Sequence, residues 1–229
     1  ATSRTHFAVN HQLRHHPMIQ SLLDEAAAGK FGEIRFLDAS SVLPMAGQGV
    51  HVLDLMFAFA GYAPVQTVFG ASSGYDDIGC EHPTARTAES LITFTNGMRG
   101  ALQAGVGAPM FEPGPSWCHK RIAVYGTHGF FHWRMNAWEK SLPDGTIERG
   151  QKDYGAEDVV GQANLTNAMF DWLEDEKKPC PTNLRTSLDE WQVILAGYLS
   201  TVESRPVDFP FDPPEDLLDQ FKRHVGAPA

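Results

Sequence analysis

Apolar and polar residues repeat with two different spacings along this 229-residue chain, and each spacing predicts a different element. Apolar positions three or four residues apart over residues 17–29 predict a helix that begins at a proline and ends at a glycine. Strict alternation over residues 33–40 predicts a strand. Helical spacing returns over residues 159–175 and again behind residues 187–190, which have the pattern of a capping box. A short helix is expected near residues 217–221.

The middle of the chain is dominated by alternating segments joined by turn residues. Residues 89–95 and 98–104 flank Asn96-Gly97, the strongest short hairpin signal, because both residues of a tight two-residue turn need positive φ. Further strands are expected at 65–71, 121–125, 130–133, 140–142 and 146–148, with a Gly-, Asp- and Ser-rich loop over 72–83.

This order of elements predicts an α+β fold with an open, mostly antiparallel sheet and helices packed on one face. The other face of such a sheet must be solvated or covered, and we expect it to serve oligomerisation.

Residues 47–61 stand out because they predict a helix of about ten residues that is apolar nearly all round. His51 and Asp54 interrupt its first turn on one face. The helix dipole lowers the pKa of such an imidazole and the carboxylate raises it, so His51 could titrate near neutrality and act as an acid or base. Alternatively, His51 is a hydrogen-bonded core residue and Asp54 only favours the helix N-terminus.

Charge and composition exclude several classes of function. The net charge is −10 and no basic run occurs, which argues against nucleic-acid or anionic-membrane binding. No apolar run is long enough to span a bilayer, and no signal peptide opens the chain, whose first residues are typical of the middle of a longer protein. Three scattered cysteines indicate free thiols in a reducing compartment, the cytoplasm.

Other chemistry-bearing residues allow only weak predictions. His11 and His15 are four apart beside His16, but no carboxylate or cysteine is adjacent in sequence, so we expect no metal site. Cys118 has basic neighbours that could lower its pKa, yet nothing marks it as a nucleophile. His119 follows a Pro/Gly loop and could contact a sugar or pack in an interface. No dinucleotide or phosphate-binding glycine motif occurs.

Several segments together resemble the C-terminal half of the glucose–fructose oxidoreductase/inositol dehydrogenase (Gfo/Idh/MocA) family. They are residues 9–17 (VNHQLRHHP), 29–34 (GKFGEI), 49–54 (GVHVLD) with Gly61, 94–97 (FTNG), 124–130 (VYGTHGF) and the two closing helices before 205–207. The resemblance covers nearly the whole chain in the right order. It implies that residues 1–229 are a substrate-binding and oligomerisation domain, and that the Rossmann domain of the family is absent from this chain.

The resemblance also implies roles for individual residues. His51 falls on the histidine that works with a lysine of the nucleotide domain in proton transfer at a sugar hydroxyl. Arg14, Gln48, Asp54 and His119 are the candidates for substrate binding. NAD or NADP would act only through the missing Rossmann domain, and none is expected to bind this chain alone. Two departures are notable: Gly47 occupies the position of a family aspartate, and the connection between Ser40 and His51 is short.

The function expected from the sequence is therefore that of a domain of an NAD(P)-dependent sugar or polyol oxidoreductase, in a homo-oligomer. The two departures favour a different possibility, a free-standing sugar-binding or assembly module without a redox role. A lyase or epimerase that uses His51 as a base is a third possibility.

Overall fold

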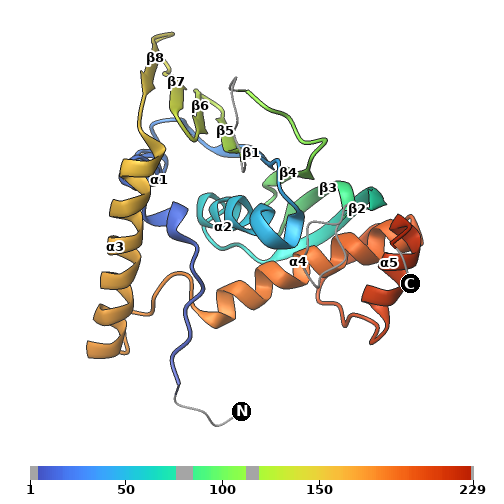
Figure 1. Ribbon diagram of the computed structural model, residues 1–229. Coiled ribbons are helices and arrows are strands. Elements are labelled where there is room, and N and C mark those ends of the chain that lie inside the picture. The colour runs from blue at the N-terminus through green and yellow to red at the C-terminus, as the bar shows by residue number, and fades with distance from the viewer. Residues whose placement is uncertain (1–4, 76–84, 112–118, 228–229) are drawn as a thin grey trace.

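A computed structural model of the protein describes residues 5–75, 85–111 and 119–227, and its centre is one open sheet (Figure 1). The strand order is β8-β7-β6-β5-β1-β4-β3-β2-β9, and every pairing is antiparallel except β1 with β4. The predicted α+β fold class is confirmed. The strands are β1 (Ile34–Ser41), β2 (Val65–Tyr75), β3 (Ala85–Phe94), β4 (Arg99–Gly105), β5 (Lys120–Gly126), β6 (Phe130–Arg134), β7 (Ala137–Ser141), β8 (Ile147–Gln151) and β9 (Val207–Asp208).

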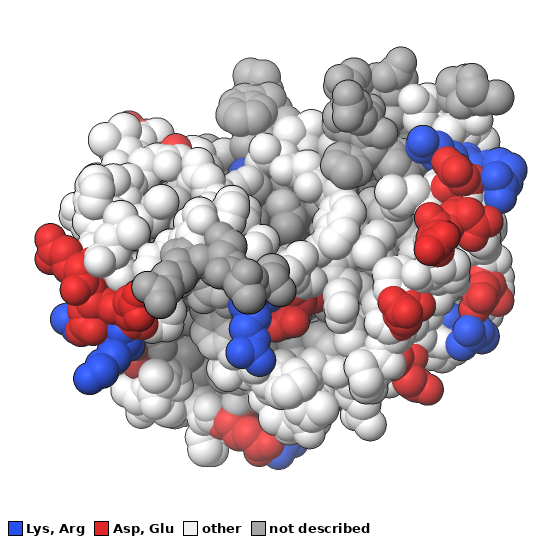
Figure 2. Space-filling model, turned by 90° about the horizontal axis from the view of Figure 1, so that it is seen from below, with Lys and Arg blue, Asp and Glu red and all other residues white. Residues whose placement is uncertain are grey.

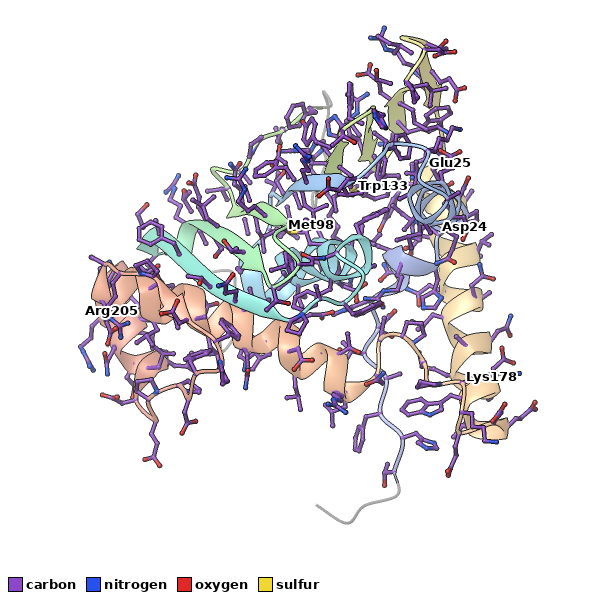
Figure 3. All side chains as sticks on the ribbon, turned by 180° about the vertical axis from the view of Figure 1, so that it is seen from behind. Asp24, Glu25, Met98, Trp133, Lys178 and Arg205 are labelled. Carbon is purple, nitrogen blue, oxygen red and sulfur yellow. The ribbon has the colours of Figure 1, made fainter. Side chains whose placement is uncertain are left out.

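The helices gather on one side of this sheet. They are α1 (Pro17–Ala27), α2 (Val50–Phe59), α3 (Tyr154–Glu174), α4 (Leu184–Glu203) and α5 (Leu217–Val225), with a 3₁₀ turn η1 (Gln12–His15) and a π turn η2 (Met45–Gly49). α2 packs on β1 and β5, α4 on β2, and α3 beside η1 (Figure 1). In Figure 3, Lys178 lies in the connection from α3 to α4, and Arg205 lies just beyond the C-terminal end of α4. Among the described residues, no helix is long and apolar enough to cross a membrane.

The predicted β3–β4 hairpin is confirmed, but its turn differs from the expected one. Phe94 pairs with Met98 through an N–H···O bond of 2.9 Å, and the Gly97 N–H donates to the Phe94 carbonyl at 2.9 Å. Of the three residues in this turn, only Gly97 has a positive φ, +84°. The loop therefore has three residues, in which a turn is followed by one left-handed glycine, instead of two left-handed residues.

Two other sequence predictions need correction. The loop expected over 72–83 is partly strand, because β2 continues to Tyr75; the rest of that loop lies outside the described residues. The capping box at 187–190 is wrong, because α4 already begins at Leu184. The side chain of Asn183 caps it, accepting the Arg185 and Thr186 N–H groups at 3.0 and 3.3 Å. Glu190 therefore lies within α4 and not at its start, and its side chain is buried in the interior.

A pair of glycines lets α4 approach β2 at backbone distance. A Cβ built on Gly70 would lie 2.3 Å from the Gly197 carbonyl oxygen. At the same place, the Gly70 N–H donates to Ser200 Oγ at 2.8 Å. No side chain can be inserted between the helix and the strand without moving one of them.

We therefore predict that Gly70→Ala lowers the free energy of unfolding by about 2–3 kcal/mol, because the added methyl group overlaps the α4 backbone. Urea unfolding would measure it. Gly47→Ala is the matched control: no atom lies within 4 Å of its added Cβ, and stability should change by less than about 0.5 kcal/mol. Equal effects of the two substitutions would contradict the proposed contact.

Candidate functional site

The start of α2 lies on the inner face of the sheet because the turn before it contains small residues. A Cβ on Gly49 would lie 3.2 Å from the Ala104 side chain of β4 and 3.1 Å from Met45 Sδ. The π turn η2 thus lies tightly against the sheet and places Gln48 and His51 at the beginning of α2. His51 is partly exposed, so it is not sealed in the apolar core.

Asp54 does not contact His51 and instead forms a buried ion pair with Arg14 of η1. Arg14 Nε donates to Asp54 Oδ2 at 3.0 Å and Nη2 to the Asp54 carbonyl at 3.2 Å, with a further bond from Nη2 to Oδ1. Both side chains are at most 3% exposed. Burial alone would raise the pKa of Asp54, but the Arg14 charge and the contact with His11 hold it below its usual value.

His11 extends this pair into a buried cluster that also contains Glu190 of α4. His11 Nδ1 lies 3.3 Å from Asp54 Oδ1 and 3.2 Å from Glu190 Oε2. Glu190 is fully buried, and sequence reasoning missed it as a member of this cluster. In the sequence, Glu190 directly precedes the apolar stripe of α4, and helix capping was the simpler interpretation of an acidic residue there.

Two members of this cluster, His11 and Glu190, hold a proton at neutral pH. Burial lowers the pKa of His11, but its contacts with Asp54 and Glu190 outweigh burial and raise it to about 9. Burial raises the pKa of Glu190 to about 8, helped by the negative charge of Asp54 and opposed by His11. His11 is therefore a cation and Glu190 a neutral acid at pH 7.

His51 has the opposite electrostatic surroundings. Burial lowers its pKa to about 3, together with the positive charges of Lys120 and His11, whose ring centroid is 5.2 Å away. The expectation that His51 titrates near neutrality is wrong, because burial and the positive charges of Lys120 and His11 outweigh the Asp54 charge that raises its pKa. His51 is therefore a neutral imidazole at physiological pH.

Two polar atoms at the start of α2 have no hydrogen-bond partner in the described structure. They are Gln48 Oε1 and His51 Nδ1, both buried. Buried polar atoms are nearly always paired, so unpaired ones three residues apart indicate a place where a bound molecule could be recognised.

The solved structures that resemble this chain are oxidoreductases. An oxidoreductase from Pseudomonas syringae superposes with a TM-score of 0.71 at 13% identity, covering 89% of this chain and 65% of its own. An oxidoreductase from Agrobacterium radiobacter, in complex with NAD⁺, L-tartaric acid and magnesium, gives 0.68 at 19%, with 88% and 64% covered. An inositol dehydrogenase homolog from Azotobacter vinelandii, with NADH and myo-inositol, gives 0.70 at 13%, with 89% and 64% covered.

This chain has the fold shared by those oxidoreductases. It spans 64–65% of the length of the three chains compared, so about a third of each has no counterpart here. No protein-family model and no curated protein matches the sequence. The resemblance to inositol dehydrogenases expected from the sequence is therefore confirmed at the level of the fold.

The oxidoreductase fold brings Arg14, Gln48, His51 and Asp54 to the start of α2 but separates His119 from them. His119 Nε2 accepts the Phe111 N–H at 3.0 Å. Phe111 also stacks on Arg121, which pairs with Asp38 on the outer face of the sheet. His119 therefore holds a loop against the face opposite α2.

Three donor groups in the described residues could hold a metal ion: His11, Asp54 and Glu190, whose donor atoms lie within 4.8 Å of one another. Arg14 already compensates Asp54, and a protonated His11 beside a neutral Glu190 leaves the cluster with an excess of positive charge, which disfavours a bound cation. His16 takes no part in this cluster, because its Nε2 lies 3.1 Å from Asp158 Oδ1.

Of the cysteines, only Cys180 is among the described residues. It is buried, with its Sγ 3.6 Å from Thr182 Oγ1.

A pocket of about 670 Å³ lies at the other end of α2. Phe57, Tyr62 and Phe209 line it together with Arg185 and Asp189 of α4. It does not include His51, so the candidate site and this pocket are separate features.

Because folded His11 and Glu190 hold buried protons, we predict that the free energy of unfolding falls as the pH rises. Folded His11 keeps a proton between its unfolded pKa of 6.5 and about 9, and folded Glu190 between 4.5 and about 8. Each retained proton lowers the unfolding free energy by about 1.4 kcal/mol per pH unit. Glu190→Gln cannot ionise, and we expect a clearly flatter profile between pH 6.5 and 8.

Urea unfolding over this pH range would test this prediction. Glu174→Gln at the exposed end of α3 is the control and should leave the slope unchanged. Parallel profiles for Glu190→Gln and the parent protein would refute the buried proton on Glu190.

Proposed function

We propose that this chain is the substrate-binding and oligomerisation domain of an NAD(P)-dependent oxidoreductase acting on a sugar or polyol. The observation that carries the proposal is the pair of unpaired polar groups, Gln48 and His51, at the start of α2 in a fold shared with NAD-linked oxidoreductases. The nucleotide cofactor would bind a domain that this chain does not contain, and hydride transfer would need that domain.

His51 is the candidate general base for alcohol oxidation. Its neutral imidazole can accept a hydrogen bond from the reacting hydroxyl, but a pKa of about 3 makes it a weak base in this chain alone, so proton transfer requires that the bound substrate or the nucleotide domain raise that pKa. Gln48 Oε1 can accept a hydrogen bond from a neighbouring hydroxyl. Arg14 and Asp54 are too buried and too fully bonded to one another to need a substrate contact, so we assign them the role of positioning α2 against η1.

The ligands of two similar structures agree with this substrate class. The Azotobacter vinelandii structure contains myo-inositol and NADH, and the Agrobacterium radiobacter structure contains L-tartaric acid and NAD⁺. Myo-inositol and L-tartaric acid both carry several hydroxyl groups, and hydroxyl groups can donate to an acceptor pair such as Gln48 and His51.

Isothermal titration of the chain with a panel of polyols, sugars and sugar acids tests the proposal. We predict that at least one of these classes binds and that His51→Ala weakens its binding about tenfold or more. His224→Ala on exposed α5 is the matched control and should have no effect. Failure of every class to bind, or binding that is indifferent to His51→Ala, would refute the proposed site.

A free-standing sugar-binding module is the second candidate function. Gly47 favours it, because this exposed glycine occupies the position where the resembling family has an aspartate of its catalytic set. The same titration with NADH, on the natural full-length protein, separates the two candidates: a module of this kind binds carbohydrate and gives no response to NADH.

The outer face of the sheet is the surface we propose for oligomerisation. Phe69 and Leu91 are register partners on neighbouring strands and are 42% and 58% exposed. Tyr125 of β5 is 40% exposed, and its ring lies 6.2 Å from that of Phe36 of β1. Exposed apolar side chains on several strands of one sheet face are typical of an interface, and a second copy of the sheet would cover them.

We predict that Leu91→Lys shifts the protein toward monomer, because the interface would bury the added charge. Light scattering coupled to gel filtration would measure the mass over a concentration series. Val159→Lys on α3 makes the same change at a position that is 71% exposed and away from the sheet, and should leave the mass unchanged. A monomeric parent protein would contradict the proposed interface.

A further inference from the structure

The pocket at the C-terminal end of α2 takes no part in the proposed function, because His51 lies at the other end of that helix. Its volume of about 670 Å³ is typical of pockets that hold small molecules, which measure roughly 300–1,000 Å³. Its walls come from the end of α2 with the link to β2, the β3–β4 turn, the first turns of α4 and the residues after β9. The pocket is therefore formed by segments that are far apart in the sequence.

Aromatic rings supply much of the apolar lining of this pocket. Phe57 is 4% exposed and packs edge-on against Phe94, with 5.8 Å between the ring centroids, so its ring is fixed by the core. Phe209 is held by a backbone hydrogen bond of 2.9 Å from its N–H to a carbonyl of β2. Tyr62 is 45% exposed, and the guanidinium of Arg14 lies 4.8 Å from its ring centroid. These rings form an apolar surface that suits a large apolar or aromatic group.

Two opposite charges on one face of α4 also line the pocket. Arg185 and Asp189 are four residues apart in the helix, which brings their Cβ atoms to about 5–6 Å from one another. Within the part of the chain that the structure describes, neither side chain forms an ion pair or a side-chain hydrogen bond. Gln192, three residues further on, adds an amide to the same lining. A guanidinium and a carboxylate are therefore both available to a molecule in this pocket.

A ligand with a single charge does not match this pair, because one member attracts it and the other repels it. A molecule that carries both charges close together satisfies both members. Its carboxylate accepts hydrogen bonds from the Arg185 guanidinium, and its ammonium group donates to the Asp189 carboxylate. α-Amino acids have this arrangement, with the carboxylate and the ammonium group on the same carbon atom. Their side chain is then left for the aromatic part of the pocket.

The charge of the whole chain also disfavours an anionic ligand. The net charge is −10, so an anion is repelled at long range. On the face shown in Figure 2, acidic and basic side chains lie side by side in several places, and uncharged side chains cover much of the area between them. A zwitterion has no net charge, so it avoids the long-range repulsion and still makes two charge-assisted bonds at short range.

We propose that this pocket binds a free α-amino acid with a large apolar or aromatic side chain. Arg185 holds the carboxylate and Asp189 the ammonium group, and the side chain packs against Phe57, Tyr62 and Phe209. The inference goes beyond the proposed function and does not rest on it, since the pocket lies apart from Gln48 and His51 at the start of α2.

Matched ligands test the proposal on the full chain by isothermal titration at neutral pH. L-Phenylalanine, L-tryptophan and L-leucine represent the proposed class. The N-acetyl form of each lacks the ammonium charge, the amide of each lacks the carboxylate, and glycine lacks the side chain. We expect at least one of the three amino acids to bind at millimolar concentration or below. Its N-acetyl form, its amide and glycine should each bind about tenfold or more weakly.

Substitutions test the two charges separately. Arg185→Gln should remove the preference for the amino acid over its amide, and Asp189→Asn should remove the preference over its N-acetyl form, because each variant lacks the charge that recognises the missing group. Arg223→Gln on α5 and Asp171→Asn on α3 make the same changes at exposed positions outside the pocket, and should alter the affinity by less than about twofold. Arg185 and Asp189 are also exposed, so both variants should fold, and circular dichroism would verify it.

Three results would overturn the inference. The first is the absence of binding by all three amino acids at millimolar concentration. The second is an amide or N-acetyl form that binds as tightly as the amino acid itself, because recognition would then not depend on both charges. The third is a preference that survives Arg185→Gln and Asp189→Asn, which would place the ligand outside this pocket. Each of these results leaves the proposed function standing, since its test uses polyols, sugars and sugar acids and depends on His51.

Discussion

The buried ion pair between Arg14 and Asp54 joins the N-terminal segment to the central helix where water does not reach. Arg14 satisfies both oxygens of the carboxylate and the carbonyl of the same residue. A single buried charge would be severely destabilising, so each member of the pair depends on the other being in place. The pair therefore fixes η1 against α2, and His11, three residues before Arg14, is positioned by the same contact. Glu190 extends the connection to α4.

The same residues act on the protonation of the candidate site. The Asp54 charge raises the pKa of His51, but burial and the positive charges of Lys120 and His11 outweigh it. The pKa of His51 falls to about 3, and the ring stays neutral. The cluster that stabilises the helix layer and the group that would do the chemistry are thus electrostatically coupled, although His51 lies on the accessible side and the cluster lies behind it.

The sheet supports this arrangement through positions where side chains are small. Gly49 allows the start of α2 to lie on β4, and Gly70 and Gly197 allow α4 to lie on β2. These contacts set the distance at which α2 and α4 meet the inner face, and hence whether Glu190 can reach His11. Met98, just before β4, and Trp133 of β6 both belong to the buried core (Figure 3). The outer face has no helix among the described elements, and exposed Phe69 and Leu91 remain on it.

Local patterns in the sequence were sufficient for the elements and the fold class. Alternation, glycine positions and the Asn96-Gly97 turn signal depend on neighbouring residues, and they predicted most strands, α1, α2 and the position of His51. Errors occurred where a residue had two local interpretations. Ser187–Glu190 matches a capping box, but Asn183 caps α4 one turn earlier, and only the packing of α4 on the sheet decides between them. The pairing of Arg14 with Asp54 and of His11 with Glu190 joins residues 40 or more positions apart. Such contacts leave no periodic signal, because the partner is chosen by the arrangement of the helices and strands and not by spacing along the chain.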